Sequence, residues 1–325
     1  MKSLMHIVRH MFRKFIRIFS IGFYLIFHLF FSFHREKILF QQKSKYNSLI
    51  IVSQCGSKRL MRFNSLSNGS QAQIDLKHKD YPCVNYIQLM ILSLIHYPFN
   101  LNEKHILIIG LGGGTLPRAL RKLYPQAFLT IIEIDPLVYE IAQKYFDFQQ
   151  DLNMKIFLTD GRKFLTNLSK TMFYDLIFFD AYDFNSGLPS HMKTQEFFNQ
   201  LKNSIHPNGG LVIFNLVCIY ESYLNVRQTI ISIFGQQNFL TYRSNDFVNM
   251  IGIASVSIEN FPKIIEKSNF IKDMKEKLSI NVYSLLKRRQ ESNFQDQSST
   301  IIYKDNMIIQ NNEQEMSLTQ FIDIV

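Results

Sequence analysis

Four acidic residues of the 325-residue chain each stand at or just beyond the end of an apolar run: Glu133, Asp160, Asp180 and Asp183. A carboxylate supplies acceptors that match the vicinal hydroxyls of a ribose, which suits Glu133, while Asp160 suits an adenine amino group. Asp180 and Asp183 together could bind a cationic amine and accept its proton. These positions therefore indicate a nucleoside site beside a proton acceptor.

Each of these residues also has a purely structural interpretation. Glu133 precedes Pro136 and could serve as an acid at a helix N-terminus, and Asp160 could cap the short helix that follows it. Asp180 could form a strand-end turn, and Asp183 could face solvent in a loop. The joint placement of the acids after successive apolar runs favours the chemical interpretation.

A glycine-rich turn precedes all four acids and is the expected centre of the site. The aliphatic run Ile106–Ile109 leads into this turn, which contains Gly110, Gly112, Gly113 and Gly114. The pattern is typical of a buried strand, a tight turn and a helix N-terminus, where backbone N–H groups meet electron-rich ligand atoms. Glu133 lies 23 positions after Gly110, near the offset of about 20 at which a carboxylate meets a nucleotide ribose.

The composition of the turn favours a nucleoside without phosphates. A nicotinamide dinucleotide site would have its third glycine where this chain has Thr115, and it would need room for a second mononucleotide. No Lys or Arg occurs between Gly110 and Pro117 to bind a phosphate. The second acid, Asp160, points to a single adenosyl group, as in S-adenosylmethionine or decarboxylated S-adenosylmethionine, and no metal is expected.

Strands and helices alternate regularly around these residues, which predicts an α/β fold with a doubly wound, mostly parallel, Rossmann-like sheet. Ligands of such a sheet lie at the carboxyl ends of its strands, where the acids are. The expected strands are Ile106–Ile109, Leu129–Ile134, Lys155–Leu158, Tyr174–Asp180 and Leu211–Leu216, followed by Phe239–Tyr242 and Val248–Val256. The expected helices are Tyr86–Leu94, Leu116–Leu123, Pro136–Phe146, Arg162–Leu168, Thr194–Ile205 and Phe261–Lys287.

The same patterns divide the chain into four predicted parts. Residues 1–37 form a basic and apolar N-terminal segment. Residues 38–80 form a small β-hairpin unit, with strands near Leu49–Val52 and Leu60–Phe63 around Gly56. Residues 81–258 form the nucleoside-binding catalytic domain, and residues 259–325 form a C-terminal helix and a polar tail.

Basic residues are concentrated at the N-terminus. Residues 1–45 hold nine of the 36 Lys and Arg residues and one of the 26 acids, which leaves 27 bases against 25 acids elsewhere. This nearly neutral remainder argues against a nucleic-acid partner. The apolar stretch 15–33 predicts membrane contact, with a buried helical extension as the alternative. Three cysteines without metal-site spacing indicate a reducing compartment. We therefore expect a cytoplasmic enzyme, either unattached or anchored with its catalytic domain in the cytosol.

The order and spacing of the motifs between about residues 45 and 255 resemble those of spermidine synthases and their spermidine-synthase-like relatives. The matching motifs are, in order, Tyr46-Asn47, Tyr86, Ile108-Ile-Gly-Leu-Gly-Gly-Gly-Thr-Leu-Pro-Arg118, Glu133-Ile-Asp135, Asp160-Gly161 and Tyr174-Asp-Leu-Ile-Phe-Phe-Asp-Ala-Tyr-Asp183. The resemblance implies a small N-terminal β unit on a methyltransferase-type α/β domain. It also implies decarboxylated S-adenosylmethionine as co-substrate, methylthioadenosine as product, a polyamine substrate and a homodimer.

The resemblance assigns roles to individual residues. Glu133 matches the family's ribose-binding carboxylate, and the pair Asp160 and Gly161 matches its adenine site. Tyr86 matches a tyrosine of the amine pocket, although it could also be a core residue of its helix. Asp180 matches the proton acceptor. The glycine turn, through Gly110, Gly112 and Gly114, completes the predicted nucleoside site.

Several positions depart from the family pattern. Asp183 matches the second acid of the Asp-x-x-Asp-Pro motif and would bind the amine, but Phe184 stands where the proline is expected. Asn47 takes the place of a glutamine at the nucleoside site, and Ile87 that of a polar residue after the tyrosine. Gly113 replaces an aspartate that holds the amino group of the aminopropyl chain in the family's synthases.

These observations predict a transferase that moves an aminopropyl group from decarboxylated S-adenosylmethionine to a diamine such as putrescine, with Asp180 as proton acceptor. The first alternative is an S-adenosylmethionine-dependent methyltransferase. Gly113 favours it, because an aspartate at this position would repel a cofactor that keeps its carboxylate. The second alternative is a non-catalytic, membrane-associated nucleoside-binding protein.

Overall fold

A large sheet of mixed strand direction forms the centre of the chain. The computed structural model describes residues 36–66, 69–182, 187–218, 222–246, 248–259, 261, 268–290 and 302–306. Within them, the strands of this sheet are β5 (His105–Ile109), β6 (Phe128–Glu133), β7 (Met154–Leu158), β8 (Leu176–Phe179), β9 (Gly210–Val217), β10 (Phe239–Arg243), β11 (Asn249–Val256) and β12 (Arg289–Gln290).

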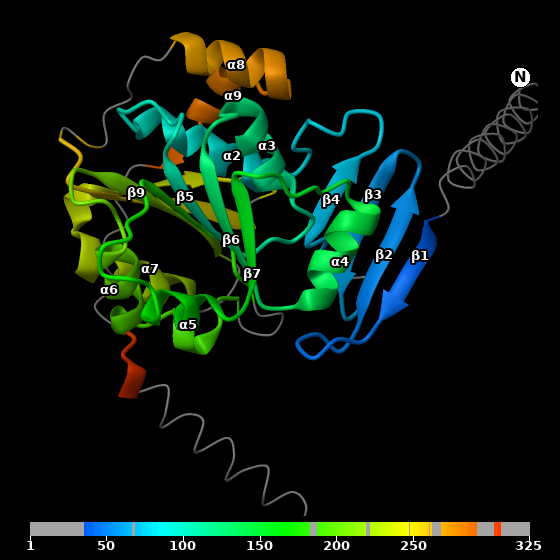
Figure 1. The fold of residues 1–325 in the computed structure, drawn as a ribbon, viewed down its shortest axis with the longest axis horizontal. Helices are drawn as coiled ribbons and strands as arrows, with labels where there is room; N and C mark the ends of the chain where they lie inside the picture. Colours follow the sequence, from blue (N-terminus) through cyan, green and yellow to red (C-terminus); the bar gives the residue numbers. More distant parts are fainter. Residues whose placement is uncertain are drawn as a thin grey trace, which may run out of the picture.

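The order of these strands is β12-β10-β11-β9-β8-β5-β6-β7, and Figure 1 labels β9, β5, β6 and β7 across this sheet. The strands from β9 to β7 run parallel, whereas β11, β10 and β12 pair antiparallel at the other side. The chain passes from β5 outward to β7 and then returns to β8 on the other side of β5. The carboxyl end of β5 is therefore the point where the strand order reverses, and ligands of such sheets bind there.

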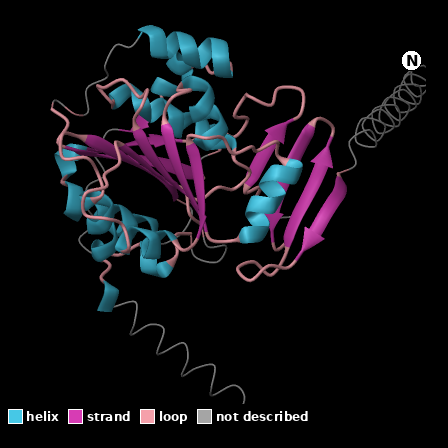
Figure 2. Cartoon of the chain, viewed as in Figure 1, coloured by secondary structure: helices cyan, strands magenta, loops and turns pink. Residues whose placement is uncertain are grey.

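Helices cover both faces of this sheet (Figure 2). One face is covered by α2 (Asn85–Leu92), η1 (Ser93–His96), α3 (Thr115–Leu123), α8 (Ser268–Leu278) and α9 (Val282–Leu286). The other face is covered by α5 (Gly161–Thr166), η2 (Ser190–Met192), α6 (Gln195–Asn203) and α7 (Tyr223–Phe234), and η3 (Gln236–Asn238) leads from α7 into β10.

Alternation along β5 explains the two layers. Ile106 and Ile108 point into one core cluster, and Leu107 and Ile109 into the other. All four are at most 2% exposed, so each contributes about 1.5–3 kcal/mol of burial free energy. Period-two alternation with apolar residues on both sides is what a central parallel strand requires.

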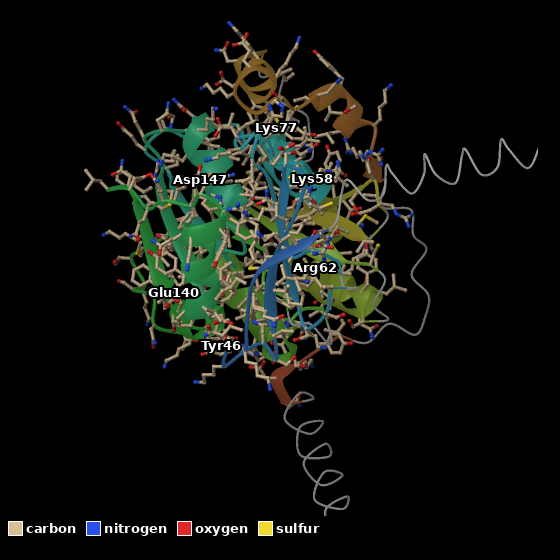
Figure 3. All side chains as sticks on the ribbon, turned by 90° about the vertical axis from the view of Figure 1, so that its right-hand side faces the viewer. Tyr46, Lys58, Arg62, Lys77, Glu140 and Asp147 are labelled. Atoms are coloured by element: carbon tan, nitrogen blue, oxygen red, sulfur yellow. The ribbon has the colours of Figure 1, made fainter. Side chains whose placement is uncertain are left out.

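A four-stranded antiparallel sheet precedes the large sheet. Its strands, β1 (Lys37–Gln42), β2 (Ile50–Cys55), β3 (Lys58–Phe63) and β4 (Ala72–Asp75), follow one another in space as in sequence. The helix α4 (Pro136–Tyr145) lies against this sheet and forms a third core cluster with it. Figure 3 looks onto this side of the molecule, with Lys58 and Arg62 on β3 and Glu140 on α4. The small sheet thus borders the large one through α4.

The predicted fold class is confirmed, and the predicted hairpin around Gly56 is formed by β2 and β3, in which Cys55 pairs with Lys58. Among the helices, two features differ from expectation. The helix α7 was not predicted. The helix expected over residues 261–287 is interrupted between α8 and α9, because Ser279 has a φ of +57° and Asn281 caps α9. The boundary proposed between residues 80 and 81 falls in the connection from β4 to α2.

The stretch 15–33, for which we predicted membrane contact, lies outside the described residues. Among the residues that the structure describes, no helix is long and apolar enough to cross a bilayer. The cytoplasmic location and the homodimer stay predictions.

Candidate active site

The glycine turn lies at the carboxyl end of β5. Gly110 has a φ of +102°, a conformation that L side chains rarely adopt. A Cβ there would lie 2.3 Å from the backbone oxygen of Asp180. Glycine is needed here because the ends of β5 and β8 approach so closely. The turn continues through Gly112 to Gly114, which is the left-handed N-cap of α3.

Glu133 ends β6 and is held beside the glycine turn. Its two carboxylate oxygens accept the backbone N–H groups of Leu111, at 3.0 Å, and Asp135, at 2.9 Å. Burial raises the pKa of Glu133, although both N–H groups favour its ionised form. Each oxygen can accept a second donor, such as a ribose hydroxyl. The helix-terminal role that was the alternative for Glu133 belongs to Asp135, which caps α4.

Asp160 follows β7 and is the N-cap of α5, which confirms the alternative interpretation of Asp160 as a helix cap. One oxygen accepts the N–H of Lys163 at 2.8 Å, and the other pairs with Nε2 of His191 at 2.8 Å. Burial raises the pKa of Asp160, but the hydrogen bonds from His191 and Lys163 outweigh burial and lower it. The next residue, Gly161, allows α5 to approach β5, because a Cβ there would lie 2.6 Å from Cγ2 of Ile109.

Asp180 follows β8 and receives two side-chain hydrogen bonds. Its Oδ1 accepts Nδ2 of Asn215 at 2.8 Å, and the hydroxyl of Tyr86 also donates to the carboxylate. Burial, together with the negative charge of Glu133, raises the pKa of Asp180 to about 7 against the lowering effect of these two donors. The group is therefore poised to gain and lose a proton near neutral pH.

Tyr86 lies in the first turn of α2 and has two roles. Its ring packs against the core beneath α2, as the alternative interpretation expected. Its hydroxyl reaches the carboxylate of Asp180, and burial together with the negative charge of Asp180 raises the pKa of Tyr86 well above its usual value. Tyr86 therefore stays a neutral donor to Asp180.

Asn47 connects the small sheet to the large one. Its Nδ2 donates to Oδ2 of Asp135 at 3.0 Å, and Ser44 donates to the same oxygen. Asp135 in turn follows Glu133 by two residues and donates its backbone N–H to that carboxylate. Asn47 is thus linked to Glu133, the predicted ribose acceptor, through Asp135. Contact of Asn47 with a nucleoside stays a prediction.

The structure brings Gly110, Glu133, Asp180 and Tyr86 together at the carboxyl ends of adjacent strands, with Asp160 at the end of the outermost parallel strand, β7. Asp183, predicted to bind the amine, lies outside the described residues. The described residues contain no cluster of His, Cys, Asp and Glu suited to a metal ion.

Two residues of this cluster were not predicted from the sequence. Asn215, on β9, donates to Asp180, and Asn249, on β11, donates to Asn215. The available signal was the single amide in the apolar run of β9, since buried polar groups need partners. No local pattern distinguishes Asn249, because it stands at the beginning of its strand.

Comparisons with known proteins agree with this geometry. Residues 88–259 match the family model of the spermine/spermidine synthase domain. The chain belongs to the spermine/spermidine synthase family. The polyamine aminopropyltransferase of Vibrio vulnificus is 33% identical over 207 residues, which cover 63% of this chain and 68% of that protein.

A second group of relatives carries a different activity in its name. The human eEF1A lysine and N-terminal methyltransferase is 33% identical over 153 residues, or 43% of this chain, but the match covers only 22% of that protein. Among solved structures, the spermidine synthase of Thermotoga maritima has a TM-score of 0.60 at 18% identity, over 79% of this chain and 86% of that one. This likeness concerns the fold. Both groups of sequence relatives are transferases, and family membership makes this chain a transferase with a co-substrate related to S-adenosylmethionine.

Proposed function

We propose that the protein transfers an aminopropyl group from decarboxylated S-adenosylmethionine to a diamine such as putrescine. In this proposal Glu133 binds the ribose hydroxyls, and Asp160 with Gly161 borders the adenine. Tyr86 and Asp183 line the amine site, and Asp180 accepts the proton of the attacking nitrogen. Family membership and the name of the Vibrio relative support this choice of reaction.

The environment of Asp180 is the observation that carries the proposal. A diamine nitrogen is cationic at neutral pH and must lose a proton before it attacks. A carboxyl group with a pKa of about 7 is partly ionised at neutral pH and basic enough to take that proton. Asp180 follows β8, and its backbone lies close to Gly110 of the glycine turn, which supports a position of this carboxylate beside the sulfonium.

The chemical step needs alignment more than activation. The ammonium nitrogen first passes a proton to the ionised carboxylate of Asp180, which frees its lone pair. The lone pair then attacks the methylene carbon next to the sulfonium, the electrons of the C–S bond pass to sulfur, and the sulfonium leaves as the neutral thioether methylthioadenosine. Burial of the carboxyl group favours its neutral, protonated form, so this proton transfer is assisted by the site.

The experiment uses the full-length protein with putrescine and decarboxylated S-adenosylmethionine, and release of methylthioadenosine is measured by mass spectrometry. We expect release by the parent protein and its loss in Asp180→Asn, which keeps the shape of the side chain but not its basicity. Asp273→Asn, a partly exposed residue of α8 that pairs with Lys277, is the matched control and should retain activity. Absence of release by the folded parent protein would contradict the proposal.

A second candidate function, methyl transfer from S-adenosylmethionine, is favoured by the packing at Gly113. A Cβ at this position would lie 2.8 Å from Cβ of Ala72 and 3.0 Å from Cδ1 of Phe146. The small sheet and the residue after α4 therefore close over the position where the family's synthases carry an acid for the aminopropyl amine. A cofactor that keeps its carboxylate would meet no opposing charge from this residue.

Calorimetry with both nucleosides separates the two functions. Tighter binding of decarboxylated S-adenosylmethionine supports aminopropyl transfer, and tighter binding of S-adenosylmethionine supports methyl transfer. Binding of either nucleoside without turnover of any amine or methyl acceptor would instead favour the non-catalytic alternative.

A further inference from the structure

A line of buried amides leads from the antiparallel edge of the sheet to the proposed proton acceptor. Asn215 on β9 is 2% exposed and Asn249 on β11 is 8% exposed. Nδ2 of Asn249 donates to Oδ1 of Asn215 at 2.8 Å, and Nδ2 of Asn215 donates to Oδ1 of Asp180 at 2.8 Å. The other residues of both strands are largely apolar and buried.

The direction of this line follows from the chemistry of the amide group. The amide oxygen can only accept and the amide nitrogen can only donate. While Nδ2 of Asn249 faces Asn215, the oxygen of Asn215 cannot turn towards Asp180 without leaving that donor unsatisfied. An unsatisfied buried donor is costly, so the nitrogen of Asn215 is held towards the carboxylate.

The beginning of β11 is itself firmly placed. The backbone N–H of Asn249 donates to Oγ of Ser244 at 3.0 Å, and the backbone N–H of Ser244 donates to the carbonyl oxygen of Asn249 at 2.9 Å. In the same turn, the N–H of Asn245 donates to Oδ1 of Asn85 at 2.8 Å. Asn85 immediately precedes Tyr86, the other donor to the carboxylate. One turn between β10 and β11 therefore supports both partners of Asp180.

We propose that Asn249 is a positioning residue, which holds the side chain of Asn215 so that its nitrogen, and not its oxygen, faces the carboxylate of Asp180. This inference rests on the proposed function, in which that carboxylate accepts a proton. Asn249 does not touch Asp180 and acts only through Asn215. A donor at this place stabilises the ionised carboxylate, and an acceptor would stabilise the protonated one.

The groups that face the carboxylate define what a change at Asn249 can do. Tyr86 donates to it from α2, Asn215 donates from β9, and the charge of Glu133 acts from β6. On the turn before β11, Asp246 accepts from Ser244. Substitution of Asn249 changes none of Glu133, Asp246 and Tyr86. Its expected effect on the pKa of Asp180 therefore comes from the orientation of the Asn215 amide.

The test follows the titration of Asp180 in the full-length protein without any substrate. Protein labelled with ¹³C at the aspartate carboxyl carbon is titrated by NMR, and the signal of Asp180 is assigned by its absence in Asp180→Asn. In Asn249→Leu the midpoint should rise by about one pH unit, because a hydrogen bond to the charged form is weakened. The ionised fraction at pH 7 would fall about fivefold.

Two controls separate positioning from a general structural effect. Ser255→Ala changes another buried polar residue of β11, 2% exposed, and should leave the midpoint unchanged. Asn215→Leu should raise the midpoint by itself, and adding Asn249→Leu to it should cause no further rise. If Asn249→Leu does not fold, Asn249→Ser is titrated in its place.

The proposal is overturned if substitution of Asn249 leaves the midpoint unchanged, or if it raises the midpoint equally when Asn215 is already Leu. Activity gives a second readout. If aminopropyl transfer is observed, kcat/KM of Asn249→Leu should fall about fivefold at pH 7 and recover at about pH 9. If no transfer is observed but the midpoint moves as expected, the proposed function fails while the positioning role of Asn249 stands.

Discussion

Replacing Asp180 with Asn should stabilise the protein at neutral and alkaline pH, because the folded state holds this carboxyl group at a cost when it is ionised. Burial raises its pKa from 3.8 to about 7. Folding therefore favours the protonated form, and the folded wild-type protein loses stability as the pH rises from about 4 to about 7. Above about pH 7 the loss is complete and constant.

The expected size follows from the two pKa values. Their difference of about 3 corresponds to as much as about 4 kcal/mol, at about 1.4 kcal/mol for each pKa unit. An asparagine is neutral at every pH and has the same shape, and its oxygen can still accept the amide of Asn215. The hydroxyl of Tyr86 can accept from the new NH₂ group, since a tyrosine hydroxyl both donates and accepts. The variant should therefore gain most of this energy.

The assay is urea unfolding of the wild-type protein and Asp180→Asn at a series of pH values, with the difference in unfolding free energy plotted against pH. We expect a difference near zero at about pH 4 that rises to a plateau above about pH 7. Asp273→Asn, at a partly exposed position of α8, should show no such rise. A difference that is the same at pH 4 and pH 8, or a variant that is less stable at pH 8, would refute the reasoning.

Three further predictions concern the surroundings of the site. Glu133→Gln should lower the pKa of Asp180, because a neighbouring negative charge is removed, and the same carboxyl NMR titration measures this shift. Gly113→Ala should destabilise the protein by about 1–3 kcal/mol in urea unfolding, because its Cβ would lie 2.8 Å from that of Ala72. Asp305→Ala removes the two hydrogen bonds that the guanidinium group of Arg162, on α5, donates to Asp305. The pair is partly exposed, so stability should fall by no more than about 1 kcal/mol, and the fall should shrink in high salt.

Whether an interaction could be predicted depends on how far apart in the sequence its residues lie. The strand, turn and helix around Gly110 could be predicted, because an apolar run, a group of glycines and an amphipathic segment are adjacent in the chain. The positions of Glu133 and Asp160 at strand ends could be predicted in the same way, because Glu133 ends β6 and Asp160 comes two residues after β7. The role of Asp160 as cap of α5 was equally visible from its neighbours.

The interruption between α8 and α9 could not be predicted from apolar spacing. Ser279 adopts a positive φ that few residues other than glycine favour, so its identity is a weak signal. Tertiary packing supplies the free energy that offsets this backbone conformation, since Ile280 is 1% exposed in the core beneath the two helices. Helix α7 was likewise not predicted. Its apolar residues pack into the core cluster shared with α5 and α6.

The sequence by itself determined the fold class, and it predicted a site at the strand ends with a glycine turn suited to a nucleoside without phosphates. These properties depend on periodicity and on residues close together in the chain. Only the tertiary structure decided which side chains surround Asp180. Asn215 lies 35 residues away from it, and Asn249 a further 34, and they meet only because β11 pairs with β9 beside β8. The closure at Gly113 also required the fold, since Ala72 reaches it from a separate sheet. Burial and contacts between distant strands set the pKa of Asp180, and neither can be read from local pattern.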